Sequence, residues 1–147
     1  MEKLLISSCL LGNNTKYNGG NNYNAMVELL KSKYELYVIC PEVMGGLSTP
    51  RNPSEIKFNT DLVFSNKKVD VTCEFHSGAN QALQIALDNN IKLALLKEGS
   101  PSCGVSKIYD GTFSGIKIDG MGITTRLLKK NGIKCYSENE IGKLLEE

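Results

Sequence analysis

Four short apolar segments recur along the chain, and a segment with helical periodicity follows each of them, in three cases after an intervening loop. The apolar segments are 3–9, 34–40, 91–97 and 133–137. The helical patterns are 21–33, 75–90, 123–132 and 138–147. Strands that alternate with helices indicate an α/β fold, in which a mainly parallel four-stranded sheet is flanked by helices. The chain has 147 residues, which is the length of one domain, so we expect a single domain over 1–147.

The connections between these segments predict the topology and the position of a site. Right-handed crossovers favour a Rossmann- or flavodoxin-like strand order of 2-1-3-4. The segment 61–72 alternates around a polar turn, which predicts a small hairpin outside the main sheet. The polar segments 12–24, 41–55 and 98–122 are predicted to be irregular loops. Loops of this length in so small a domain favour a functional role, here the walls of a substrate pocket.

Charge and hydropathy exclude several classes of partner. The net charge is +1 and the pI is about 7.6, which gives no reason to expect a nucleic acid polymer or an anionic membrane as a partner. No segment approaches the roughly 20 apolar residues of a membrane span. The N-terminal segment lacks the basic region and long apolar region of a signal peptide. We therefore expect a cytoplasmic protein.

Three of the five cysteines follow predicted strands, and this places them at one edge of the sheet. Cys9, Cys40 and Cys103 each lie at or beyond the carboxyl end of a strand, within turn-forming or irregular sequence. With the order 2-1-3-4, these strand ends meet at the point where open α/β sheets bind ligands. Cys73 and Cys135 lie outside this group, and we expect both to be structural.

Three thiolates that converge on one crevice leave one coordination position of a metal centre open. Two centres fit this pattern, a catalytic zinc ion and an iron–sulfur cluster with one iron that lacks a protein ligand. The single histidine, His76, excludes a site with several histidine ligands from within this chain. The cysteines come from different segments without a C-x-x-C pair, which fits a structural zinc knuckle poorly.

Five motifs in order resemble the thiouracil desulfidase family over nearly the whole chain. They are "SSCLLG…KYNGG", "CPEVMGGLSTPRNPSEI", "KEGSPSCG", "IYDGTFSG" and "GMGITTRLLKKNGI". The resemblance implies a 4Fe–4S cluster with three cysteine ligands, Cys9, Cys40 and Cys103, and one open iron that binds the sulfur of the substrate. The implied reaction is the non-redox desulfuration of a thiolated pyrimidine, which gives uracil and hydrogen sulfide.

The same resemblance places acid–base catalysis at Glu42, two residues after Cys40, and at Ser100, three residues before Cys103. Further polar residues in the motifs and loops are candidates for substrate binding: Arg51, Ser48, Asn13 and Asp110. Three aromatic residues in the loops are candidates for stacking on a pyrimidine ring: Tyr17, Tyr109 and Phe113.

Alternatives from other functional classes remain open at the level of sequence. A zinc-thiolate hydrolase uses the same three cysteines, and so does a non-catalytic iron–sulfur sensor or sulfur-carrier module. The small-molecule substrate is open as to a 2-thio or 4-thio group and as to free base, nucleoside or nucleotide. A monomer and a homodimer are both compatible with the sequence.

Overall fold

The main sheet has four parallel strands, and their order confirms the predicted 2-1-3-4 topology. In a computed structural model that describes residues 1–146, the strands are β1 (Glu2–Ser7), β2 (Tyr34–Ile39), β5 (Leu93–Leu96) and β8 (Lys134–Ser137). They are ordered β2-β1-β5-β8. The register aligns Leu4 with Leu36 on one side and with Leu93 on the other. Both central strands, β1 and β5, are buried almost throughout because helices cover both faces of the sheet.

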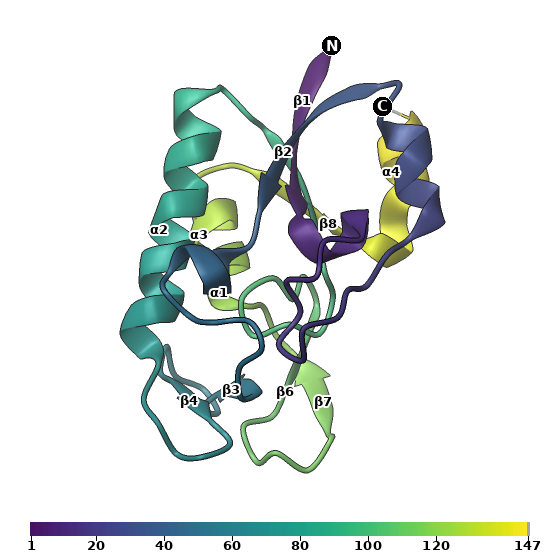
Figure 1. The fold of residues 1–147 in the computed structure, drawn as a ribbon. Helices are drawn as coiled ribbons and strands as arrows, with labels where there is room; N and C mark the ends of the chain where they lie inside the picture. Colours follow the sequence, from purple (N-terminus) through teal and green to yellow (C-terminus); the bar gives the residue numbers. More distant parts are fainter. Residues whose placement is uncertain (147) are drawn as a thin grey trace.

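Each face of the sheet has its own hydrophobic core, because successive strand residues point to opposite faces. Helices α2 (Thr72–Asp88) and α3 (Ile123–Lys130) pack on the face that presents Leu5 and Ala94. The opposite face presents Leu4 and Ile6 to the 3₁₀ helix η2 (Ala25–Leu30) and to α4 (Ile141–Glu146), which follows the 3₁₀ turn η3 (Glu138–Glu140). Figure 1 shows α2 and α3 on one side of the strands and α4 on the other. Within residues 1–146, no helix is long and apolar enough to cross a bilayer.

The helix predicted over 21–33 is shorter than expected and has a tighter winding. Only η2 forms there, and the Asn24 side chain accepts a hydrogen bond from the Met26 N–H at 3.0 Å at its start. Val27 and Leu30 are buried, whereas Met26 is half exposed. A spacing of three places Val27 and Leu30 on one face of a 3₁₀ helix, whose repeat is three residues per turn.

Two small hairpins lie beyond the carboxyl edge of the main sheet (Figure 1). One pairs β3 (Ser54–Ile56) with β4 (Val63–Ser65), and the other pairs β6 (Lys107–Tyr109) with β7 (Lys117–Asp119). The hairpin predicted over 61–72 also forms: the Ser65 N–H donates to the Val69 carbonyl, the Val71 N–H donates to the Val63 carbonyl, and Phe64 bridges to Asp70. The sequence did not predict that β4 pairs in addition with β3. The β6–β7 pair lies in a stretch predicted to be irregular.

The segment 41–55 begins with a short helix, α1 (Pro41–Met44), where an irregular loop was predicted. This helix directly follows β2, and it packs closely against α2. A Cβ atom on Gly78 of α2 would lie 1.8 Å from the Pro41 carbonyl oxygen, and one on Gly45 would lie 1.9 Å from the Glu74 carbonyl oxygen. Only glycine at both positions allows the two backbones to approach so closely. The contact fixes the residues at the start of α1.

Candidate functional site

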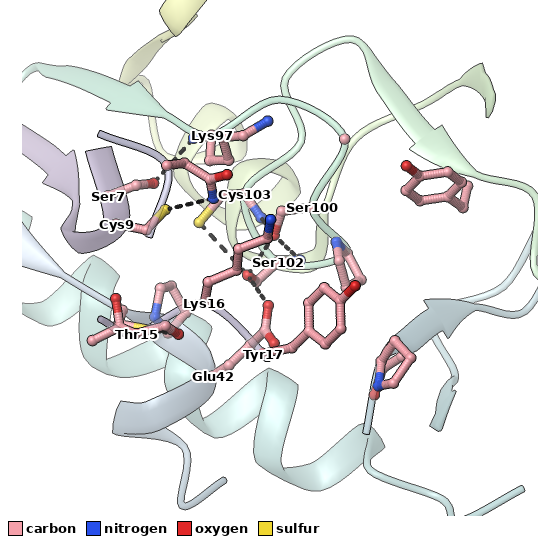
Figure 2. Close-up of a pocket in the computed structure, with 18 of the residues that line it drawn as sticks. Ser7, Cys9, Thr15, Lys16, Tyr17, Glu42, Lys97, Ser100, Ser102 and Cys103 are labelled. Carbon is pink, nitrogen blue, oxygen red and sulfur yellow. Dashed lines mark hydrogen bonds between the residues drawn. The ribbon is translucent and has the colours of Figure 1, made fainter. Parts of the chain in front are cut away.

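A cavity of about 510 Å³ opens at the carboxyl edge of the sheet, and all three strand-end cysteines line it. Its walls come from the segments that follow β1, β2 and β5 and from the two small hairpins. The connection that follows β1 leads to β2 on one side of β1. The connection that follows β2 leads back to β5 on the other side of β1. The cavity thus lies at the switch point of the sheet, where ligands bind in open α/β folds. Figure 2 shows Cys9, Glu42 and Cys103 directed toward the same space.

Cys9 and Cys40 are held by the loop that follows β1. Cys9 lies in the 3₁₀ turn η1 (Ser8–Leu11), and the Asn22 side-chain amide donates to its Sγ at 3.3 Å. The Asn22 backbone N–H also donates to the Cys9 carbonyl, which closes the loop back onto the turn. Cys40 is the N-cap residue of α1, and its Sγ lies 3.9 Å from the Thr15 carbonyl oxygen.

Cys103 belongs to a tight turn that is held against the start of α3. The Ser100 Oγ accepts hydrogen bonds from the backbone N–H groups of Ser102 at 3.1 Å and Cys103 at 3.0 Å. First-turn N–H groups of α3 donate to the carbonyls of Pro101 and Ser102. These carbonyls satisfy donors that a helix start leaves without intrahelical partners. A Cβ atom on Gly122 would lie 2.4 Å from the Ser102 carbonyl carbon, so glycine is required for this close contact.

Burial governs the protonation of the thiols. Desolvation raises the pKa of Cys103 to about 12, although hydrogen bonds from Ser7 and Ser102 act in the opposite direction. Desolvation also raises the pKa of Cys9, and the Asn22 hydrogen bond lowers it in part. Without a bound cation these thiols are protonated at neutral pH. Binding of a metal centre must then release protons, as is general for thiolate ligands.

The donor set fits an iron–sulfur cluster. Soft thiolates are the ligands that hold such clusters, and three of them face one cavity. The Asn22 amide already donates to the Cys9 sulfur, and the Ser102 Oγ lies 3.6 Å from the Cys103 sulfur. Within residues 1–146, no group of three or more His, Cys, Asp and Glu side chains is arranged to hold a single metal ion.

Cys73 and Cys135 lie away from this cavity. Cys135 is buried in β8, as expected for a small apolar residue, and burial raises its pKa to about 12. Cys73 is exposed near the start of α2, so it contributes nothing to the core.

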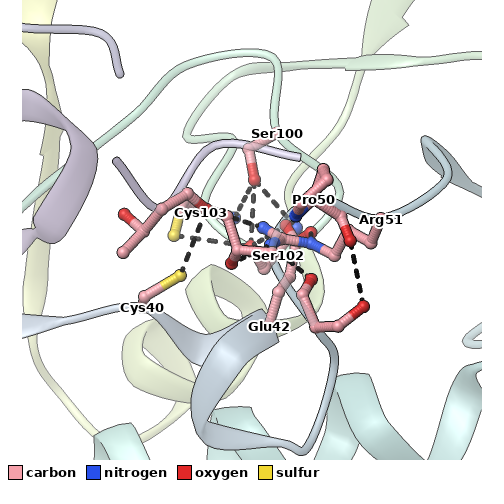
Figure 3. A network of polar contacts seen from close by, with 10 residues as sticks. Cys40, Glu42, Pro50, Arg51, Ser100, Ser102 and Cys103 are labelled. Carbon is pink, nitrogen blue, oxygen red and sulfur yellow. Dashed lines mark hydrogen bonds and ion pairs between the residues drawn. The ribbon is translucent and has the colours of Figure 1, made fainter. Parts of the chain in front are cut away.

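Glu42 is fixed on the cavity wall by an ion pair and a hydroxyl group (Figure 3). Its Oε1 lies 3.0 Å from the Arg51 Nε, and both side chains are nearly buried, at 8% exposure for Arg51 and 13% for Glu42. Its Oε2 accepts a hydrogen bond from the Ser102 Oγ at 2.8 Å. The carboxylate therefore has one oxygen held by the cation and the other directed along a chain of hydroxyl groups.

Arg51, a predicted substrate-binding residue, lines the cavity but is occupied by the protein itself. Besides Glu42, its guanidinium donates to the Ser48 carbonyl at 3.2 Å, to the Thr49 Oγ1 at 3.1 Å and to the Thr15 carbonyl at 2.9 Å. These contacts tie α1 to the loop after β1. The geometry assigns Arg51 to the positioning of Glu42.

Three predicted substrate-binding residues do not line the cavity. The Ser48 hydroxyl donates to the Pro50 carbonyl at 3.0 Å, which uses its proton within its own turn. Asn13 is exposed in the loop after β1. Asp110 accepts hydrogen bonds from the Thr112 side chain and backbone, which lower its pKa and hold it in the β6–β7 turn. A position within a family motif or loop therefore did not by itself bring these side chains to the cavity wall.

Other residues line the cavity that sequence reasoning had passed over or left open. The three aromatic candidates, Tyr17, Tyr109 and Phe113, are all in its wall. Three lysines, Lys16, Lys97 and Lys117, were not predicted and also line it. Lys97 forms an ion pair with Glu138 at 2.9 Å. Ser102, which is buried next to Cys103, was missed because serine in a turn carries no sign of a distant partner.

Glu98 fastens the loop that follows Cys103. Its Oε1 accepts from the backbone N–H groups of Val105 at 2.8 Å, Ser106 at 2.9 Å and Lys107 at 2.9 Å, and its Oε2 accepts from the Ser106 hydroxyl at 2.8 Å. Partial burial acts to raise the pKa of Glu98, but these hydrogen bonds outweigh it and the pKa is lowered. A carboxylate thus closes the turn that carries Cys103.

We expect a Glu98→Gln variant to lose about 1–2 kcal/mol of unfolding free energy at pH 7, because glutamine replaces charge-assisted hydrogen bonds with weaker neutral ones. A lowered pKa in the folded state stabilises the protein above the unfolded pKa of about 4.3, and this contribution disappears as the pH falls through the folded pKa. The difference between wild type and variant should therefore shrink on acidification. Urea unfolding of both proteins at a series of pH values from 7 to 3.5 measures this difference.

The exposed Glu2 provides a matched control, since Glu2→Gln removes the same charge without removing such a network. Its unfolding free energy should stay within about 0.5 kcal/mol of wild type. Equal losses in the two variants would show that Glu98 acts only through the net charge of the protein.

Comparisons with known proteins cover nearly the whole chain. A family model described as 2-thiouracil desulfurase matches residues 4–140. The uncharacterized protein YbbK of Bacillus subtilis (strain 168) is 41% identical over 150 residues, which cover 97% of this chain and 99% of that protein. The solved structure of a protein named [4Fe-4S]-dependent thiouracil desulfidase TudS has a TM-score of 0.92 and 41% identity, and the match covers 99% of this chain and 96% of that one.

Proposed function

The chain belongs to the 2-thiouracil desulfurase family, and on this premise we propose that it removes sulfur from a thiolated pyrimidine. The reaction takes up one water molecule and gives uracil and hydrogen sulfide. The observation that carries the proposal is the convergence of three thiols with Glu42 and Ser100 on one cavity. The similarity to TudS supports an iron–sulfur centre as the group that these thiols bind.

Cys9, Cys40 and Cys103, which all line the cavity, are the residues that would hold a 4Fe–4S cluster, and three ligands would leave one iron without a protein ligand. When bound, the cluster supplies a soft Lewis acid that polarises the thiocarbonyl group. The protein contributes a cavity with a mixed polar and aromatic wall, which suits a flat heterocycle with carbonyl and N–H groups. Tyr109 and Phe113 are available to contact the ring from the side of the β6–β7 hairpin.

Glu42 and Ser100 supply the proton transfers that the reaction requires. Addition of water to the ring carbon needs an acceptor for a water proton, and collapse of the tetrahedral intermediate needs proton delivery to the ring or to sulfur. The Glu42 Oε2, which accepts the Ser102 hydroxyl, is the oxygen that takes up the proton, because Oε1 is held by Arg51. The Ser100 oxygen accepts two backbone N–H groups, an arrangement that stabilises negative charge on oxygen.

The test is turnover by protein purified without oxygen and loaded with iron and sulfide. Incubation with 2-thiouracil, 4-thiouracil and their nucleosides and nucleotides should give uracil or its nucleoside or nucleotide, together with one sulfide for each molecule converted. Iron, zinc and acid-labile sulfide are measured on the same sample. Stoichiometric zinc without labile sulfide would refute the cluster, and a full cluster without conversion of any thiopyrimidine would refute the reaction.

Replacement of the proposed acid–base carboxylate should leave the centre intact and stop the chemistry. In Glu42→Gln, the amide oxygen can still accept from Arg51, but the amide nitrogen cannot accept the Ser102 proton. We expect kcat to fall about 10³-fold, within the range for loss of a general acid–base group, while the iron content is unchanged.

Glu35→Gln serves as the control for this substitution, because Glu35 is exposed on β2 outside the cavity. Its kcat should equal that of wild type. A Glu42→Gln enzyme with a full cluster and wild-type turnover would remove Glu42 from the mechanism.

A further inference from the structure

Ser102 lies between the two residues that the proposed function assigns to proton transfer. Among residues 1–146, Glu42 and Ser100 share no direct hydrogen bond. The Ser102 Oγ bridges them, at 2.8 Å from the Glu42 Oε2 and 2.9 Å from the Ser100 Oγ (Figure 3). It is also 3.6 Å from the Cys103 Sγ. The Ser102 residue is only 2% exposed, so these contacts are made largely out of reach of water.

The direction of the hydrogen bonds follows from counting protons. The Ser102 hydroxyl has one proton, and the Glu42 carboxylate is the strongest acceptor within reach. When Ser102 donates to Glu42, the Ser100 hydroxyl is the partner that donates to Ser102. The remaining lone pairs on the Ser100 oxygen accept the N–H groups of Ser102 and Cys103. The proton of Ser100 is thus directed toward Glu42 through Ser102.

The Ser102 hydroxyl is not required to form the turn around it. The Gly104 N–H donates to the Ser100 carbonyl, and the carbonyl of Ser102 accepts from the N–H groups of Thr124 and Thr125. These contacts are made by backbone atoms, and they survive replacement of the side chain. Within residues 1–146, the polar contacts of the hydroxyl are with Glu42, Ser100 and Cys103, all of which line the cavity.

We propose that Ser102 is a positioning residue that relays a proton between the Ser100 Oγ and the Glu42 Oε2. The proposal rests on the proposed desulfuration. As the Ser100 oxygen takes a proton from the attacking water, its own proton passes to the Ser102 oxygen while the Ser102 proton passes to the Glu42 Oε2. Both serines end neutral, Glu42 is protonated, and the hydroxide that the water leaves adds to the ring carbon. The reverse sequence returns the proton to Ser100 for delivery to the substrate.

The experiment compares Ser102→Ala with wild type in the cluster-loaded enzyme. We expect kcat to fall about 10²-fold or more with an unchanged KM, because Ser102 does not bind the substrate. In mixtures of H₂O and D₂O, a plot of the wild-type kcat against the deuterium fraction should be curved, because more than one proton moves in the same step. The dependence should become linear in the variant. Iron content, labile sulfide and the electron paramagnetic resonance spectrum of the reduced cluster should match wild type.

Ser65→Ala is the matched control, since Ser65 is also buried and its hydroxyl accepts from Lys67 and Val69 outside the cavity. It should alter stability and leave kcat and the D₂O dependence unchanged. Wild-type kcat in Ser102→Ala would overturn the relay. So would loss of the cluster in that variant, which would show a structural role.

A second measurement separates the relay from the desulfuration itself. Urea unfolding of cluster-free wild type, Glu42→Gln, Ser102→Ala and the double variant gives a double-mutant cycle that needs no substrate. Destabilisation that is not additive supports the hydrogen bond on which the relay depends, and additive effects overturn it. If wild type converts no thiopyrimidine, the proposed function fails while this cycle still tests the link between Glu42 and Ser102.

Discussion

A Cys103→Ala variant purified without oxygen is expected to contain no iron–sulfur cluster and to release no sulfide from thiouracil. Cys103 is one of only three cysteines on the cavity wall, and its loss leaves two thiolates for a centre that is proposed to use all three. Wild type should hold about four irons and four labile sulfides per chain, as a 4Fe–4S cluster requires. Chemical assay of iron and sulfide, together with visible absorption, measures the difference.

Two other cysteines make this prediction specific to the cavity. Cys135→Ala removes another buried thiol, and should cost about 1 kcal/mol of unfolding free energy while the cluster is retained. Cys73→Ala removes an exposed thiol and should change neither the unfolding free energy nor the cluster content. A Cys103→Ala protein with wild-type iron would exclude Cys103 as a ligand, and loss of iron in all three variants would point to a general effect of thiol removal.

A Gly78→Ala variant is expected to lose at least about 3 kcal/mol of unfolding free energy and most of its bound iron. The new methyl group would lie 1.8 Å from the Pro41 carbonyl oxygen, so α1 must shift away from α2. Backbone atoms cannot rotate aside as a flexible side chain can, and the cost exceeds the usual penalty for overpacking. Cys40 caps α1 and Glu42 lies in its first turn, so the shift moves a proposed ligand and a proposed acid–base group together.

Gly142 in α4 provides the contrasting case for the same substitution. Apart from its chain neighbours and the backbone of its own helix, no atom lies within 4 Å of the position that its Cβ would occupy, and the residue is exposed. Gly142→Ala should stabilise the protein by about 0.5–1 kcal/mol through helix propensity and leave the iron content unchanged. Urea unfolding and iron assay on both variants test the pair. Equal stability of the two variants would contradict the close contact between α1 and α2.

The main sheet was predictable because its signals are local and its connections obey a handedness rule. Each apolar run is long enough to be recognised, and right-handed crossovers then leave few strand orders. The β6–β7 hairpin was not predictable, since each strand has three residues. Part of its support is distant: the Glu55 carboxylate accepts from the N–H groups of Gly111 and Phe113. The six-residue η2 was misread because periods of 3 and 3.6 differ little over so short a segment.

The same contrast between local and distant information applies to the site. The convergence of Cys9, Cys40 and Cys103 followed from topology, because the carboxyl ends of parallel strands meet at one edge. The direction of individual side chains did not follow from topology. Ser48 lies in a motif of the family but turns to its own loop, whereas Ser102 turns to a carboxylate 60 positions away. Such directions depend on packing between elements, which no short stretch of sequence contains.

The backbone contacts that hold the three thiols also bear on how the enzyme matures. Each cysteine is positioned by turns, helix termini and strands of the protein alone, and the sheet is closed by β8, which follows the last of them by about 30 residues. Under the proposed ligand set, a centre lost to oxygen is expected to leave these turns in place, because hydrogen bonds within the protein hold them. The emptied cavity could then take up iron and sulfide again.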